Sequence, residues 1–177
     1  MFIILIMLGA GLVWFVYPEE KLDLTYSNLS ITGKISEMLK KRKFEITLTE
    51  QEVGDLIKKQ LILSNAISPE FQIKGARFEL ESNLLTAYMN LSYMNMIDIG
   101  TVTYFELTWN DPNVTAAYQR TEVKRFVLPT AWLMIQSIEI PVTDLFPSVL
   151  GVGNMAFEKD SVRISFKLNR MLPPKNK

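Results

Sequence analysis

The chain has 177 residues, 48% of them hydrophobic, and its 19 Lys and Arg residues balance 19 Asp and Glu residues. This length suits one domain with a substantial core, and a formal net charge of zero provides no overall field that would attract nucleic acid. The sequence contains neither Cys nor His. Their absence excludes disulfides, Cys nucleophiles, His general bases and metal sites built on Cys or His, so we expect no metal and no cofactor.

Residues 1–17 form an uncharged apolar run that ends at Pro18, which acidic residues follow. At ~1.5 Å per residue such a helix would be roughly 25 Å long, at the short end of what crosses a bilayer. Trp14 and Tyr17 lie near its end, where aromatic side chains favour the headgroup level. The run lacks the basic start and the small-residue cleavage site of a secretory signal peptide. We therefore predict an uncleaved transmembrane signal anchor over residues 1–17 rather than a buried core helix.

Such an anchor would make the chain a single-pass protein of the cell membrane. No Lys or Arg precedes the apolar run, so the distribution of basic residues does not set its orientation. We expect the rest of the chain on the extracytoplasmic side, because the stub ahead of the anchor is too short to be a domain.

Residues 18–43 are a turn-rich connector. It ends in four consecutive cations, which have two interpretations. They contact anionic lipid headgroups at the membrane surface, at about 1 kcal/mol each, or they form the solvated face of a linker. The four cations are Lys40, Lys41, Arg42 and Lys43.

The segment 44–61 predicts a strand followed by an amphipathic helix. Phe44, Ile46 and Leu48 alternate with polar residues, which is the two-residue period of a half-buried strand. Thr49 and Glu52 have the spacing of a capping box, in which each side chain accepts a hydrogen bond from the other residue's backbone N–H. Apolar residues follow at helical spacing, so one side of the helix is apolar. They are Val53, Leu56, Ile57 and Leu61.

The sequence after this helix predicts antiparallel strands. Gly75 interrupts an alternating strand and indicates a bulge or a close backbone approach. Two long strands are expected over residues 85–94 and 102–109. Residues 110–113 then connect to a third strand over 114–126, whose charge predicts a place near the sheet edge. One face of the first two strands carries Leu85, Ala87, Met89, Leu91 and Tyr93, followed by Thr103, Phe105, Leu107 and Trp109.

The C-terminal part predicts a short second helix, a loop and a closing hairpin. Pro129 suits the first turn of a helix that extends to Ile138, and the loop then runs to Gly153. The hairpin strands are expected over 155–157 and 162–168.

These elements predict an α+β fold. An N-terminal transmembrane helix is followed by a curved antiparallel sheet packed on one amphipathic helix plus a short second helix. The binding domain would span residues 44–170, and residues 171–177 would be a loose polar tail.

The order of these features resembles the YpmS-like family of membrane-anchored proteins from Gram-positive bacteria. The resemblance rests on the apolar N-terminal run, the strand-to-helix step over residues 48–53, the helix start at Leu128-Pro129 and the closing strand over 162–168. It implies no assigned activity. More distantly, the order is similar to tubular lipid-binding (TULIP-like) domains, in which a long curved antiparallel sheet wraps an amphipathic helix and acyl chains lie between them.

The sequence contains no phosphate-binding glycine loop, dinucleotide-binding motif, nucleophile elbow or EF-hand, and we expect no enzyme. The favoured function is an anchored binding module that holds a lipid or another apolar ligand between sheet and helix, where adaptable Met and aromatic side chains suit such a ligand. Two alternatives stay open. The same side chains fill an ordinary core, or the chain is a non-catalytic interaction subunit of an envelope membrane complex.

The expected partners are therefore membrane lipid and envelope membrane proteins, and not nucleic acid. The residues expected to line the ligand are Met89, Leu91, Tyr93, Thr103, Phe105 and Leu107 from the strands, with Val53, Leu56 and Ile57 from the helix.

Overall fold

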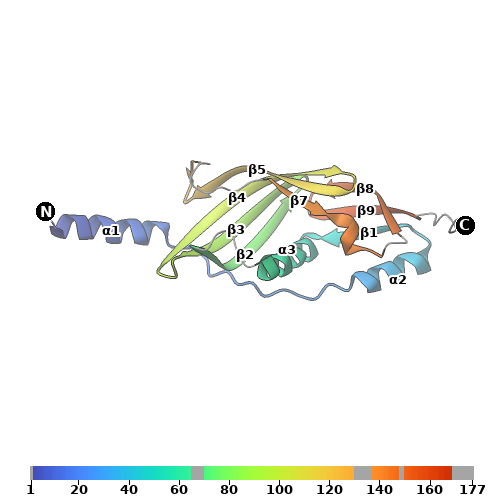
Figure 1. The fold of residues 1–177 in the computed structure, drawn as a ribbon, viewed down its shortest axis with the longest axis horizontal. Helices are drawn as coiled ribbons and strands as arrows, with labels where there is room; N and C mark the ends of the chain where they lie inside the picture. The colour runs from blue at the N-terminus through green and yellow to red at the C-terminus, as the bar shows by residue number, and fades with distance from the viewer. Residues whose placement is uncertain (1, 65–69, 130–136, 148–149, 169–177) are drawn as a thin grey trace, which may run out of the picture.

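The computed structural model describes residues 2–64, 70–129, 137–147 and 150–168. Helix α1 extends away from one end of an elongated body of strands, and α2 lies at the opposite end (Figure 1). The helices are α1 (Phe2–Val16), α2 (Ile31–Lys41), α3 (Glu50–Ser64) and the 3-10 helix η1 (Val142–Leu145). The strands are β1 (Glu45–Thr49), β2 (Phe71–Glu81), β3 (Leu84–Tyr93), β4 (Ile97–Asn110), β5 (Asn113–Val123), β6 (Phe126–Val127), β7 (Ile138–Pro141), β8 (Leu150–Glu158) and β9 (Ser161–Leu168).

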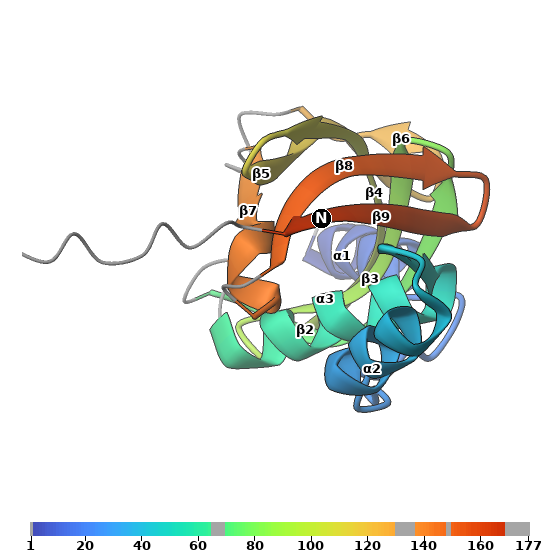
Figure 2. The same ribbon diagram turned by 90° about the vertical axis from the view of Figure 1, so that its right-hand side faces the viewer.

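The strands form two antiparallel sheets. The larger has the order β2-β3-β4-β5-β6, and β7 also pairs with β5. The smaller has the order β1-β9-β8. Seen along the long axis, α3 and α2 lie on the same side of the smaller sheet (Figure 2), and both contact β1. The predicted α+β class with antiparallel pairing is confirmed.

The junction between β1 and α3 confirms the predicted strand and capping box. Ile46 and Leu48 are buried, whereas Phe44 precedes β1 and is exposed. The Glu52 N–H donates to Thr49 Oγ1 at 3.3 Å, and the Thr49 N–H donates to Glu52 Oε2 at 2.9 Å. These two bonds satisfy backbone donors that the first turn of a helix would otherwise leave free.

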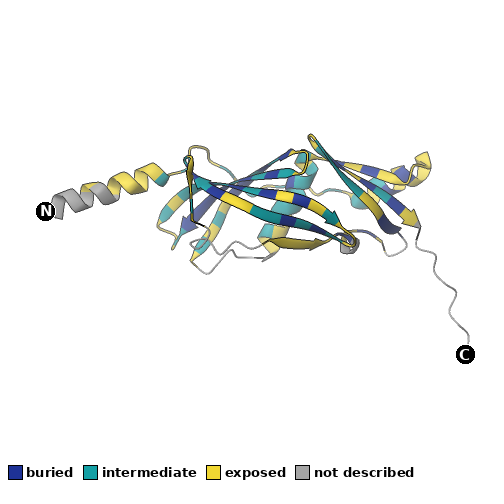
Figure 3. Ribbon diagram, turned by 90° about the horizontal axis from the view of Figure 1, so that it is seen from above, coloured by how far each residue is buried: buried dark blue, intermediate teal, exposed yellow. Residues whose placement is uncertain are grey.

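We call the face of the large sheet that packs against α3 the inner face and the opposite one the outer face. On the inner face Leu85 lies opposite Phe105 and Ala87 opposite Thr103, as the alternation of the sequence predicts. Helix α3 contacts β2 on this face, where Gly54 faces Phe78. The inner face therefore builds the core with α3, and buried residues concentrate on the strands (Figure 3). The outer face carries the residues between these positions.

The prediction that the charged strand β5 lies near the sheet edge is confirmed, because among the described residues only the short strands β7 and β6 pair with its outer side, at residues 113–116 and 122–123. Two other expectations for this part of the chain need correction. Ile138 belongs to β7 and not to a helix, and most of the predicted second helix falls on residues 130–136, outside the described ranges. The loop expected up to Gly153 contains β7, η1 and the start of β8, so the closing hairpin is longer than predicted.

The connector contains an additional helix. The sequence indicated only a short amphipathic turn, whereas α2 covers 11 residues. Ser30 caps it by accepting a hydrogen bond from the Gly33 N–H at 3.0 Å, and Ile35 and Met38 are buried. Helix α2 contacts β1, so it is part of the fold.

Helix α1 covers 15 residues, and its described side chains are mostly exposed (Figure 3). Within the described ranges, no helix reaches the length and hydropathy that a membrane crossing requires. The predicted tail over 171–177 lies outside the described residues.

Candidate functional site

The inner face brings together most of the residues expected to line a ligand. Met89, Leu91, Phe105 and Leu107 are buried in one apolar cluster, and Val53, Leu56 and Ile57 of α3 pack against it half-buried. Two of the expected residues are not buried apolar members of this cluster. Tyr93 is half-buried beside Phe71, with ring centroids 5.1 Å apart, and Thr103 is 0% exposed.

A group of hydroxyls interrupts this apolar cluster. Thr103 Oγ1 and Thr121 Oγ1 are 2.9 Å apart and form a hydrogen bond, and Thr101 Oγ1 donates to the Met89 carbonyl at 3.3 Å. The Tyr118 hydroxyl is buried and has no hydrogen-bond partner among the described residues. A buried hydroxyl without a partner destabilises a fold by about 1–3 kcal/mol. The Tyr118 hydroxyl could therefore bond a polar group that the described residues do not supply. No local pattern in the sequence predicts this hydroxyl, because its burial depends on packing across several strands.

An open cavity lies beside α2, at the end of the molecule opposite α1 (Figure 1). Its volume is about 270 Å³, and α2 and β1 line it. Glu37 and Lys41 form an ion pair of 2.6 Å at its wall, and this hydrogen bond and the lysine charge lower the pKa of the Glu37 carboxyl. The lining residues are Lys34, Glu37, Met38, Lys41, Lys43, Glu45, Ile46 and Thr47. This cavity is distinct from the inner face, where the ligand was expected.

The basic run lies at this same end. Lys40 and Lys41 end α2, and Arg42 adopts the left-handed conformation that caps the helix, with Lys43 directly after it. The membrane-surface hypothesis assumed that these cations lie beside the apolar N-terminal run. In the structure α2 and α1 lie at opposite ends of the molecule (Figure 1). That assumption is wrong, and lipid contact by the four cations stays a prediction.

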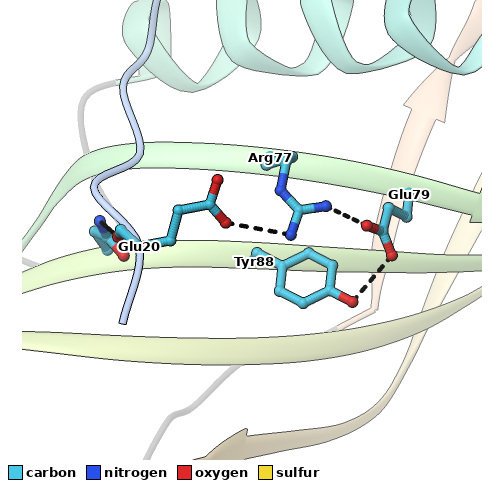
Figure 4. Close-up of polar contacts among 5 residues, drawn as sticks. Glu20, Arg77, Glu79 and Tyr88 are labelled. Carbon is cyan, nitrogen blue, oxygen red and sulfur yellow. Dashed lines mark hydrogen bonds and ion pairs between the residues drawn. The ribbon is translucent and has the colours of Figure 1, made fainter. Parts of the chain in front are cut away.

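The outer face carries a network of charged and aromatic side chains. Arg77 donates to Glu79 and lies 3.4 Å from Glu20 of the connector, and its guanidinium carbon is 4.1 Å from the centre of the Tyr88 ring (Figure 4). The Tyr88 hydroxyl donates to Glu79 Oε2 at 2.9 Å. Burial raises the pKa of Tyr88, and the Glu79 carboxylate raises it further. Tyr88 therefore remains a neutral hydrogen-bond donor at neutral pH.

The connector crosses this outer face along a row in which two glycines flank one asparagine. Gly75, Asn90 and Gly100 pair across β2, β3 and β4, and we call them the glycine row. A Cβ on Gly75 would lie 2.0 Å from the Leu22 carbonyl oxygen, and one on Gly100 would lie 2.9 Å from Pro18 Cα.

Two hydrogen bonds fix this crossing. The Asn90 side chain donates to the Glu20 carbonyl at 2.8 Å, and the Ala76 N–H donates to the Asp23 carbonyl at 3.0 Å. The close backbone approach and the bulge predicted at Gly75 are therefore confirmed, with a register shift between Ile73 and Gly75. The sequence did not reveal that residues 18–23 are the segment that approaches.

No group of three or more acidic side chains in the described ranges is placed to hold a metal ion. In comparisons with known proteins, the chain matches no family model, no curated protein and no solved structure. The YpmS-like and TULIP-like resemblances therefore stay predictions.

Proposed function

We propose that this chain is a membrane-tethered, non-catalytic binding module on the extracytoplasmic side of the cell membrane. Its ligand is a lipid or another apolar molecule with a polar acceptor group, held between the inner face of the large sheet and α3. Helix α1 is the tether. An uncharged helix that leaves the body with exposed apolar side chains needs a covering medium, and a bilayer supplies one.

One observation carries the ligand proposal: the unpartnered Tyr118 hydroxyl within an apolar layer. The Tyr118 ring packs against Phe105 with centroids 6.2 Å apart, so the hydroxyl belongs to the same layer as the expected lining residues. Sites for apolar ligands are lined mostly by hydrophobic side chains, with a few polar groups that fix orientation. An ester or carboxyl oxygen would satisfy this donor.

The proposal can be tested with the full chain in lipid nanodiscs that contain a phospholipid with a photoactivatable acyl chain. After irradiation, mass spectrometry of peptides locates the adducts. We expect adducts on α3 and the inner-face residues of β3 to β5, in addition to α1. Adducts confined to α1 would contradict ligand binding in the core.

The variant Tyr118→Phe sharpens the test, because it removes the hydroxyl and keeps the ring. If a ligand accepts from the hydroxyl, the yield of inner-face adducts falls in this variant. If the hydroxyl is only an unsatisfied core group, the adduct yield stays unchanged and the free energy of unfolding rises by about 1–3 kcal/mol. Tyr88→Phe on the outer face is the matched control, and it should leave the adducts unchanged.

The second candidate function is a non-catalytic interaction subunit of an envelope membrane complex. The exposed side chains of α1 also favour it, since a partner helix could cover them. Crosslinking in membranes would then recover a second protein on α1, and the inner face would carry no adducts.

A further inference from the structure

Two turns flank the point where α1 leaves the body of the molecule (Figure 1). The turn between β3 and β4 exposes Met96, with 76% of its surface accessible, and Met94. The hairpin of β5 and β6 exposes Phe126, with 65% accessible, and Val127. We call Met94, Met96, Phe126 and Val127 the apolar rim. Two of these large apolar side chains lie in a turn and two directly follow one, which is unusual because exposed turns of soluble domains are mostly polar.

The rim is continuous with the end of α1. The rings of Phe15 and Phe126 make an edge contact with centroids 5.6 Å apart. Lys124 Nζ lies 6.0 Å from the centre of the Trp14 ring and 3.7 Å from Glu19 Oε1. These contacts fix the β5–β6 hairpin against α1, and α1 also contacts β4, the strand that follows the turn with Met94 and Met96. Whatever surrounds the end of α1 therefore lies close to both turns.

The backbone of both turns supports a role for their side chains. Met94 and Asn95 have φ angles of 49° and 57°, and Lys124 and Arg125 have φ angles of 44° and 73°. Glycine or asparagine adopts this left-handed conformation most easily, and other residues are less stable there by roughly 1–2 kcal/mol each. Three of these four positions instead hold a long apolar or cationic side chain. A residue that is unfavourable for the backbone of a turn indicates that its side chain has a function.

We propose that the apolar rim inserts into the interface of the lipid bilayer that holds α1, and so seats the sheet end on the membrane. This rests on the proposed membrane tether. Trp14, which is 80% exposed, and Tyr17 would then lie at the headgroup level beside the rim. Met and Phe side chains would enter the acyl boundary while Lys124 and Arg125 face anionic headgroups. The basic run at the end of α2, at the opposite end of the molecule (Figure 1), would lie away from this bilayer.

The absence of Cys from the chain makes a direct test possible, because each single-Cys variant carries one label without background. Four full-length variants are labelled with a nitroxide and reconstituted in vesicles of phosphatidylcholine and phosphatidylglycerol. Met96→Cys and Phe126→Cys report on the two turns, Leu12→Cys reports on α1, and Leu39→Cys on α2 is the matched exposed control. Electron paramagnetic resonance then compares collisions of each label with oxygen, which enters the bilayer, and with a water-soluble nickel complex.

The expected result is an oxygen-to-nickel collision ratio severalfold higher at Met96 and Phe126 than at Leu39, with the highest ratio at Leu12. If Leu12 is in the bilayer but both rim labels resemble Leu39, the rim proposal is overturned and the tether stands. If Leu12 also resembles Leu39, both the tether and the rim proposal are overturned. Since the two rim sites are labelled separately, misfolding of one variant, detected by its thermal unfolding, leaves the other to decide.

Discussion

The two faces of the large sheet are covered in different ways. Side chains cover the inner face, where Leu107 and its neighbours meet α3 in one apolar cluster. Backbone covers part of the outer face, where residues 18–23 lie directly on the glycine row. Strand β3 is buried on both sides as a result, since Asn90, Leu91 and Ser92 are consecutive buried residues. Helix α3 covers the inner face through contacts between apolar side chains. Residues 18–23 cover the outer face where two glycines leave room for their backbone.

Removal of a large inner-face side chain should have the largest effect. Leu107→Ala deletes buried methyl groups beside Ala116 of β5, and the cavity it leaves should lower the free energy of unfolding by about 2–5 kcal/mol. Denaturant unfolding of the full chain measures this value. Thr108→Ala, at the next and exposed position of the same strand, is the control and should change stability by less than about 0.5 kcal/mol. Equal effects would show that the inner face is not the core.

Addition of a single methyl group should break the cover of the outer face. In Gly75→Ala the new Cβ meets the Leu22 carbonyl oxygen at 2.0 Å, so the connector must move away. We expect a loss of roughly 1–3 kcal/mol and faster hydrogen exchange of the Ala76 amide, which donates to Asp23.

The matched control for this substitution is Gly153→Ala on β8. Its Cβ would find its nearest neighbour, the Ser165 carbonyl oxygen, at 3.4 Å, and the exchange of the Ala76 amide should not change. If the two alanine variants behave alike, the close contact between connector and sheet is not what makes glycine necessary at position 75.

The stability that the capping box of α3 contributes should depend on pH, and this is the smallest of the expected effects. Burial raises the pKa of Glu52, but hydrogen bonds from Lys34 Nζ and the Thr49 N–H, together with the lysine charge, lower it more, so the net pKa lies below its ordinary 4.5. The unfolded chain therefore binds the proton more readily. The stabilisation is fully present above about pH 4.5 and is lost as the pH falls through the lower folded pKa.

Glu52→Gln measures this contribution, because it imitates the protonated carboxyl. It should lower stability by about 1 kcal/mol at neutral pH, and the difference from the native chain should narrow below about pH 4.5. In a Lys34→Gln background much of the effect of Glu52→Gln should disappear. A difference that is constant from pH 3 to pH 7 would contradict the role of the carboxylate charge.

The parts of this fold that depend on neighbours in sequence were predictable. The alternation in β1, β3 and β4, the capping box at Thr49 and the close approach at Gly75 all follow from local patterns. Most residues expected to line a ligand do converge in one cluster, because the two-residue period of adjacent strands assigns side chains to faces.

Long-range pairing limited the rest. The short strands β6 and β7 both pair with β5, and with two and four residues they are too short for a period in their own sequences to predict them. The same holds for residues 18–23, whose place is set by glycines that follow more than fifty positions later in the chain. The unpartnered Tyr118 hydroxyl and the rim beside α1 likewise appear only when distant strands are assembled.

The path of the connector determines how the body moves relative to whatever holds α1. A flexible linker of about a dozen residues would have a root-mean-square end-to-end distance of roughly 20 Å, so the body could take many positions relative to α1. Here Glu20 is bonded to β3 and Asp23 to β2, so any pull on α1 would act as shear on these two strands. The connector therefore fixes the direction in which α1 leaves the sheet, so the orientation of the body relative to α1 is part of the fold.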